Sequence, residues 1–193
     1  EMLRSLVGSE MCIRDREDSV LIIIDYQDAI LNTFSAPLRE QLQRQTILAI
    51  RMAQQLKLPI IVMEQYPQGL GITNTEVKEV LGEDYQPIPK KVFSAAEFIT
   101  GRLEELGRRQ LLIIGIETHI CVMQTAVDLL DIGYAVFLLT DVVGSRYKHD
   151  FKAGCNLITR AGGLTTTLQT VLYNYLNAAQ GPDFKAMLPY LKG

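Results

Sequence analysis

The sequence predicts a single-domain α/β protein with three layers, in which helices cover both faces of a six-stranded parallel sheet. The chain has 193 residues, which is the usual size of one domain. Short apolar runs alternate along it with segments of helical periodicity. The runs are apolar throughout rather than at every second position, as expected of strands that are buried on both faces.

The predicted strands are short, and the first is the most hydrophobic of them. It reads SVLIIID and covers residues 19–25. The other five are expected at residues 59–64, 91–93, 110–115, 134–141 and 163–168. Residues 91–93 give the weakest strand signal of the six.

The predicted helices lie between these strands. They are expected at residues 37–57, 74–81, 94–106, 120–132 and 148–160, with one or two short helices in the tail. Pro37 suits a first helical turn. Ser94 begins the sequence S-A-A-E, which matches a capping box, and Gly107 is placed to end that helix.

The first sixteen residues differ in character from the rest. The segment EMLRSLVGSEMCIRDR has neither helical nor strand periodicity, and it lacks the long apolar region of a signal peptide. Its SLVGSEMCIRD stretch resembles translated sequencing-adapter sequence. We therefore expect residues 1–16 to be non-native or disordered, Cys12 to have no role, and the domain to comprise residues 17–193. An ordinary frayed tail is the alternative.

Composition narrows the classes of function. A net charge of −3 disfavours nucleic acids and anionic membranes as partners, and no apolar stretch approaches the ~18 residues of a membrane span. Three widely spaced cysteines, without a C-x-x-C pair, argue against a disulfide framework or structural zinc, so a cytoplasmic location is expected. Dinucleotide, P-loop, serine-hydrolase and zincin motifs are also missing from the sequence.

In parallel sheets, ligands bind beyond the carboxyl ends of the strands. This rule selects the strand-end positions Asp25 and Glu64 together with residues 90–94, 116–121 and 141–146.

Cys121 is the position in this set with the clearest chemistry. At the start of a helix, its thiol would feel the helix dipole and free amides, which favour the thiolate. A small buried hydrophobe is the alternative, and Cys155 is expected to pack in the interior. Asp25 ends the most apolar strand and either has a charged partner or caps a turn. One of the two lysines Lys90 and Lys91 is a candidate for a buried catalytic ammonium; the alternative is that both are solvated.

Four segments carry a family resemblance: LIIIDYQ, PKKVFSA, GIETHICV and TDVVGSR. Together they resemble the isochorismatase-like cysteine hydrolases over about residues 18–190, and within them the isochorismatase-domain-containing proteins. The resemblance implies a Rossmann-like topology and a catalytic triad of Asp25, Lys90 and Cys121, with Lys90 preferred to Lys91 because it lies three residues before Phe93. It also implies a cis peptide between Ile116 and Glu117 and an oxyanion hole made by the backbone amides of Glu117 and Cys121.

The implied activity is a metal-independent hydrolysis of a small amide- or ester-like substrate through a Cys121 thioester. The D-x-H metal element of nicotinamidases is replaced here by MEQYPQG, so no metal or other cofactor is expected. Tyr66, Phe93, Thr118 and His119 are predicted pocket walls. The partners expected are a small-molecule substrate and further copies of the chain, as a dimer or larger homo-oligomer. A non-catalytic interaction protein and a thiol redox sensor at Cys121 are the alternatives.

Overall fold

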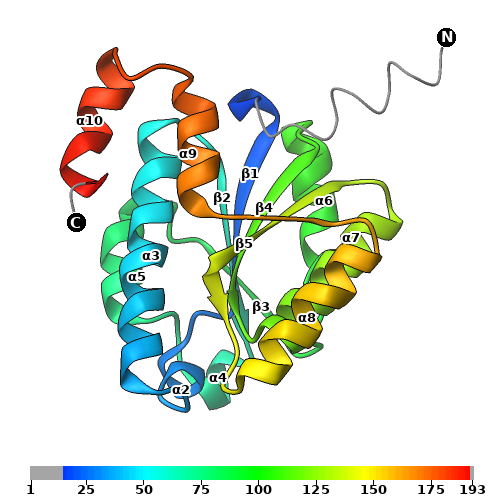
Figure 1. Ribbon diagram of the computed structural model, residues 1–193. Helices are drawn as coiled ribbons and strands as arrows, with labels where there is room; N and C mark the ends of the chain where they lie inside the picture. The colour runs from blue at the N-terminus through cyan, green and yellow to red at the C-terminus, as the bar shows by residue number, and fades with distance from the viewer. Residues whose placement is uncertain (1–14, 192–193) are drawn as a thin grey trace, which may run out of the picture.

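The computed structural model describes residues 15–191, and these form a three-layer α/β/α fold around a six-stranded sheet (Figure 1). The strand order is β3-β2-β1-β4-β5-β6, and all five pairings are parallel. The predicted fold class is confirmed. The strands are β1 (Ser19–Ile24), β2 (Ile60–Gln65), β3 (Pro87–Lys90), β4 (Gln110–Ile116), β5 (Ala135–Gly144) and β6 (Leu164–Thr166).

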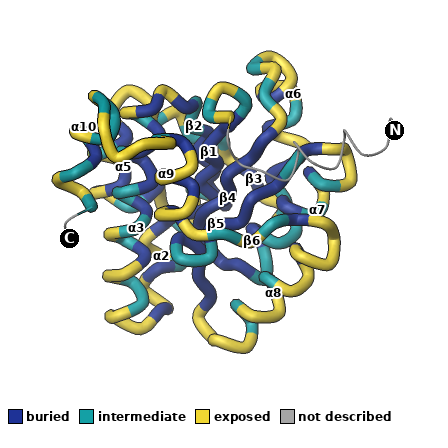
Figure 2. Tube along the Cα trace, turned by 45° about the horizontal axis from the view of Figure 1, so that its top comes forward, coloured by how far each residue is buried: buried dark blue, intermediate teal, exposed yellow. Residues whose placement is uncertain are grey.

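The two faces of the sheet are covered by different helices. Alternate residues of β1 point to opposite faces, so Leu21 and Ile23 join one apolar core while Ile22 and Ile24 join the other. The central strands are buried throughout, as Figure 2 shows in dark blue. This double burial explains why the run is apolar at every position.

The first core is covered by α3 (Ala36–Gln55), α5 (Thr75–Leu81), α9 (Leu168–Leu176) and α10 (Pro182–Leu191). The second is covered by α6 (Ala96–Leu106), α7 (Met123–Asp131) and α8 (Lys148–Arg160). Short helices α2 (Asp28–Leu31) and α4 (Pro67–Leu70) follow β1 and β2, and the 3-10 turns η1 (Arg16–Asp18) and η2 (Gly82–Asp84) come before β1 and β3. No helix within residues 15–191 is long and apolar enough to cross a bilayer.

The third strand departs from the prediction. It comprises Pro87–Lys90, and residues 91–93 lie beyond its end, so the predicted strand 91–93 is wrong. The strand lies at an edge of the sheet, where half of its amides need no ladder partner, and therefore tolerates Pro87 and Pro89. The helix expected from Ser94 begins at Ala96, where the Ser94 hydroxyl accepts a bond from the Ala96 amide at 3.3 Å.

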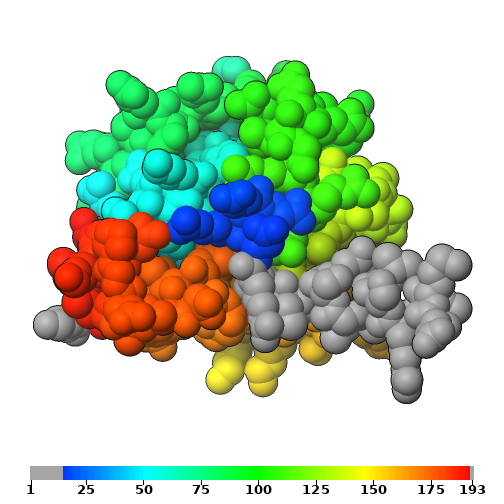
Figure 3. All heavy atoms as spheres, turned by 90° about the horizontal axis from the view of Figure 1, so that it is seen from above, coloured from blue at the N-terminus to red at the C-terminus, as the bar shows by residue number. Residues whose placement is uncertain are grey.

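The start of the described chain packs at the amino end of the sheet, against α9 and α10 (Figure 3). Arg16 Nη1 lies 2.8 Å from Asp183 Oδ2, and the Tyr175 hydroxyl donates to Ser19 Oγ at 2.7 Å. Residues 1–14, the greater part of the predicted foreign segment, lie outside the described residues. The boundary at residue 17 stays a prediction, and a chain that began there would lose the ion pair of Arg16 together with the hydrogen bonds that the carbonyls of Asp15 and Arg16 accept from Ser19 and Arg108.

The strand order reverses its direction between β1 and β4. From β1 the chain adds β2 and β3 on one side, and then crosses to add β4, β5 and β6 on the other. Such a switch point leaves a crevice beyond the carboxyl ends of the two central strands. Gly115 makes their close approach possible, because a Cβ at that position would collide with the backbone of Ile24.

Candidate active site

Asp25 lies at the point where β1 ends, and its side chain is completely buried. Its φ of +51° places the backbone in the left-handed region, which aspartate tolerates better than most residues. The Asp25 amide donates to the Met63 carbonyl on β2 at 3.1 Å, and the Asp25 carbonyl accepts from the Gln27 amide at 2.8 Å. The turn ends the strand and leaves a carboxyl group at the switch point.

Lys90 ends β3 and is the partner of this carboxyl. Its ammonium lies 2.6 Å from Asp25 Oδ2, and both side chains are fully buried. The same ammonium donates to Gln65 Oε1 at 2.6 Å and to the Val92 carbonyl at 3.3 Å. Three acceptors therefore match the three protons of a charged lysine, which satisfies the hydrogen-bonding needs of a buried ammonium.

Lys91 points elsewhere. It is exposed, and its Nζ lies 5.8 Å from the centroid of the Tyr66 ring. Of the two lysines that the sequence offered, Lys90 is thus the one that contacts Asp25.

Cys121 lies in η3 (Thr118–Val122), a single π-helical turn between β4 and α7. The thiol is buried, and this burial is the main cause that raises its pKa to about 12; the Asp25 carboxylate raises it further, while Lys90 opposes the shift. Burial also raises the pKa of the Asp25 carboxyl, which Lys90 and the Cys121 side chain lower. The three groups thus form one electrostatic cluster.

The position of Cys121 at a helix start favoured the thiolate, with a small buried hydrophobe as the alternative, whereas the burial of Cys121 in the structure favours the thiol. Helix-dipole stabilisation at a helix start was the reason to favour the thiolate, but the thiol lies inside a buried π-turn that precedes α7. Desolvation outweighs the neighbouring ammonium, so the resting side chain is a thiol at neutral pH.

A proton acceptor lies beside that thiol. Asp25 Oδ1 is buried and has no hydrogen-bond partner among the described residues, since Lys90 binds the other oxygen. A buried carboxylate oxygen with so few partners is uncommon, and the neighbouring Cys121 thiol, whose hydrogen bond lowers the pKa of Asp25, is the donor available to it.

The segment between β4 and Cys121 has the expected backbone geometry. The Ile116–Glu117 peptide bond is cis. The Glu117 carbonyl accepts from the amides of Ile120 and Val122 at 3.1 and 3.3 Å, and its carboxylate accepts from the Arg146 amide at 2.9 Å. Glu117 is therefore anchored at both its backbone and its side chain, directly before the turn that carries the thiol.

The four predicted pocket walls lie in different environments. Tyr66 and Phe93 are about half exposed, whereas Thr118 is buried with a hydroxyl that has no described partner. His119 Nδ1 lies 3.0 Å from Ser145 Oγ, and its Nε2 lies 3.8 Å from Asp150. The imidazole thus contacts Ser145, the residue after the end of β5, and Asp150 on α8.

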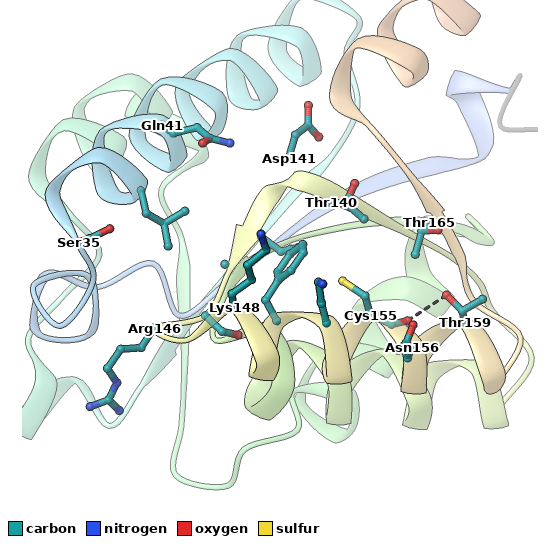
Figure 4. A pocket seen from close by; sticks show the side chains of 16 residues that line it. Ser35, Gln41, Thr140, Asp141, Arg146, Lys148, Cys155, Asn156, Thr159 and Thr165 are labelled. Atoms are coloured by element: carbon teal, nitrogen blue, oxygen red, sulfur yellow. Dashed lines mark hydrogen bonds between the residues drawn. The ribbon is translucent and has the colours of Figure 1, made fainter.

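A cavity of about 950 Å³ lies elsewhere, between α3, β5 and α8 (Figure 4). Arg146 and Cys155 are among its lining residues, and none of the four predicted pocket walls is. Cys155, which was expected to pack in the interior, is partly exposed here, and burial raises the pKa of its thiol.

Sequence reasoning missed two glutamines that hold the cluster in place. Gln65 bonds Lys90, as given above, and Gln27 bonds the main chain of Gln65. Position was the available signal, since Gln65 is the last residue of β2. Glu64, which was selected instead, accepts three bonds on Oε1, from the Thr73 amide and hydroxyl and from the Tyr85 hydroxyl, at 2.7 to 2.8 Å.

Asp141, the other selected acid, binds the first residue of α9, because its Oδ1 accepts from the Leu168 amide at 2.9 Å. Within residues 15–191, no three His, Cys, Asp or Glu side chains are grouped so that they could hold a metal ion.

Comparisons with a family model and with individual proteins both match this chain to isochorismatase-type proteins. The family model described as the isochorismatase domain matches residues 19–170. Isochorismatase family protein 1B of Dictyostelium discoideum is 30% identical over 184 residues, which covers 91% of this chain and 87% of that protein.

Two solved structures extend these matches to the fold. That of MAR1 ribonuclease from Caenorhabditis elegans superposes with a TM-score of 0.85 at 29% identity, over 93% of this chain and 92% of the other. The YcaC protein of Escherichia coli, described as an octameric hydrolase of unknown specificity, has a TM-score of 0.81 at 20% identity, over 92% of both chains. At that identity the second likeness concerns the fold alone.

Proposed function

The chain belongs to the isochorismatase family, and from this premise we propose that it is a metal-independent cysteine hydrolase of small amides or esters. The observation that carries the proposal is the buried Lys90–Asp25 pair, 2.6 Å apart, beside the Cys121 thiol. Asp25 Oδ1, the oxygen that Lys90 does not bind, is buried and is the base that this proposal assigns to the neighbouring cysteine.

The first step is a proton transfer within the cluster. Asp25 Oδ1 takes the proton of the Cys121 thiol when the substrate arrives, and Lys90 balances the negative charge, which moves from oxygen to sulfur. The cluster carries one positive and one negative charge before and after the transfer. The step therefore changes no net charge in a buried site, where a change of charge is costly.

The thiolate then attacks the acyl carbon of the substrate. A carbon–sulfur bond forms while the carbonyl oxygen becomes an oxyanion, for which the backbone amides of Glu117 and Cys121 are the proposed donors. The carbon–nitrogen or carbon–oxygen bond breaks, and Asp25 gives its proton to the leaving group. A thioester on Cys121 is the product of this half-reaction.

Water completes the cycle. Asp25, now a carboxylate again, takes a proton from a water molecule as that water attacks the thioester. The acid product leaves, and the proton returns from Asp25 to the Cys121 sulfur. One carboxylate serves both half-reactions, so the mechanism needs no histidine, and His119 is already engaged with Ser145 and Asp150.

A panel of small amides and esters tests the proposal. Wild type is compared with Cys121→Ala, Asp25→Asn and Lys90→Met, and each variant is checked for folding by circular dichroism. We expect hydrolysis of at least one compound by the wild type and its loss in all three variants. Activity that survives Cys121→Ala refutes the mechanism, and a folded protein that hydrolyses nothing favours the interaction-protein alternative.

RNA is included in the panel because one similar structure is that of a ribonuclease. We expect no cleavage, since a net charge of −3 offers a polyanion little attraction. Cleavage of RNA that depends on Cys121 would replace the small-molecule substrate in the proposal.

Assembly and location complete the proposal. We expect a homo-oligomer, a dimer or larger, in the cytoplasm. Light scattering of the purified chain measures the oligomeric state, and a monomeric mass would contradict the first expectation.

A further inference from the structure

We propose that Gln65 is a positioning residue of the active site, which holds the Lys90 ammonium against Asp25 and thereby sets the reactivity of Cys121. The inference rests on the proposed function for its meaning in turnover, but its geometry is independent of any substrate. Gln65 lies at the end of β2, between the strands that carry Asp25 and Lys90.

The side-chain amide of Gln65 can accept a hydrogen bond from Lys90 in one orientation only. Its Nε2 donates to the Lys91 carbonyl at 2.9 Å, so Oε1 is the atom left to accept from the Lys90 ammonium at 2.6 Å. A flipped amide would direct an N–H group at the ammonium and an oxygen at a carbonyl, which are both repulsive contacts. The Lys91 carbonyl therefore fixes which atom faces Lys90.

The backbone of Gln65 is held in turn by Gln27. The Gln65 amide donates to Gln27 Oε1 at 2.7 Å, and Gln27 Nε2 donates to the Gln65 carbonyl at 3.0 Å. Asp25 turns out of the strand conformation just before this point. The side chain of Gln27 thus supplies the donor and the acceptor that a continued β1 would have offered to β2.

These contacts keep Lys90 protonated and hold its ammonium in one position. Gln65 Oε1, Asp25 Oδ2 and the Val92 carbonyl are all acceptors, and a neutral amine would direct its lone pair at one of them. Without Gln65, one N–H of a fully buried lysine loses its partner, and the ammonium is free to shift away from the thiol. The Cys121 thiol would then become harder to ionise.

Two substitutions test this role. Gln65→Met keeps the length of the side chain but removes both polar atoms. Gln65→Glu keeps an acceptor for Lys90 and adds a negative charge beside the cluster. Gln54→Met is the matched control, because Gln54 also donates to main-chain carbonyls, those of Val80 and Leu81 at 3.1 and 3.3 Å, but on α3.

The measurement is the rate at which iodoacetamide alkylates Cys121 at pH 8 to 9, mapped by peptide mass spectrometry with Cys155 as the internal reference. Below its pKa, a thiol reacts in proportion to its thiolate fraction, so an increase of one pKa unit slows the reaction ~10-fold. We expect a ~10-fold slower reaction at Cys121 in Gln65→Met and a larger decrease in Gln65→Glu. Cys155 should be unaffected, and Gln54→Met should behave as wild type.

Unchanged or faster alkylation of Cys121 in the folded variants overturns the proposal, because a merely structural glutamine would lower the melting temperature without changing this rate. If Gln65→Met does not fold, Gln65→Glu alone decides. The readout needs no turnover: slower alkylation in a chain that hydrolyses nothing supports the positioning role and refutes the proposed function separately.

Discussion

The regions around Cys121 and Cys155 differ in the partners they give a thiol. Cys155 is partly exposed on α8 beside an open cavity, whereas Cys121 is buried in a π-turn at the switch point of the sheet. Burial raises the pKa of both thiols. Cys121 alone has a carboxyl and an ammonium among the groups that shift its pKa. The nearby carboxyl and ammonium, rather than solvent access, are therefore the reason why we propose Cys121 and not Cys155 as the nucleophile.

The largest expected effect separates the two cysteines directly. Cys121→Ala removes the nucleophile, so hydrolysis of any substrate found in the panel should fall by ~10³-fold or more. Cys155→Ala should leave the rate within ~2-fold, because a change that removes no catalytic contact costs little transition-state stabilisation. The measurement is kcat/KM for both variants. Equal losses would remove the distinction on which the comparison rests.

The second prediction compares the stability effects of two lysines, one in each region. Lys90→Met leaves Asp25 as an uncompensated buried carboxylate, which should lower the free energy of unfolding by ~3–5 kcal/mol. Lys152→Met, at an exposed residue of the cavity, should change it by less than ~0.5 kcal/mol. Urea unfolding at pH 7 measures both. A small effect at Lys90 would mean that the cluster is solvated.

The pH dependence of stability tests the burial of the thiol. Because the pKa of Cys121 is about 12 in the folded state, against an ordinary value of 9, the folded state keeps a proton that the unfolded state loses. The stabilisation is complete below pH 9 and is lost as the pH rises from 9 to 12, by ~1.4 kcal/mol per pH unit. The difference between wild type and Cys121→Ala in urea unfolding isolates this effect. A pH-independent difference would contradict it.

The smallest expected effect concerns Thr118, in the same turn as Cys121. Its buried hydroxyl has no described partner, so Thr118→Val should not lower the free energy of unfolding by more than ~0.5 kcal/mol. A predicted pocket wall should still affect KM, since the hydroxyl is free to bond a substrate. Thermal unfolding measures the effect on stability, and substrate titration measures the effect on KM. A large loss of stability would show that the hydroxyl has a structural role.

Most of the sheet could be predicted because its strands are buried on both faces and therefore read as continuous apolar runs. β1 and β4 are of this kind. β3 could not be placed, since an edge strand that contains Pro87 and Pro89 lacks both the apolar run and the amides that mark a strand. The apolar residues Val92 and Phe93, on which the prediction relied, are exposed.

The site could be predicted in part. The sequence placed Asp25 at a strand end, Cys121 at a helix start and Lys90 next to the expected strand 91–93, and the sheet topology brings Asp25 and Lys90 into contact. The protonation state of the thiol could not be read from the sequence, because it depends on how deeply neighbouring helices bury the turn. Gln27 and Gln65 were missed for a related reason. A side-chain amide is neither charged nor nucleophilic, so its role is visible only from the groups with which it forms hydrogen bonds.

The proposed mechanism is tested most directly by trapping its covalent intermediate. Wild type and Asp25→Asn are mixed with p-nitrophenyl acetate, an activated ester whose leaving group needs no proton, and quenched for peptide mass mapping. We expect an acetyl group on Cys121 that forms and turns over in wild type, and little or no acetylation of Cys121 in Asp25→Asn, because no base remains to take the proton of a thiol whose pKa is raised to about 12. Release of p-nitrophenol by wild type without acetylation of Cys121, or with the acetyl group on Cys155, would contradict the mechanism.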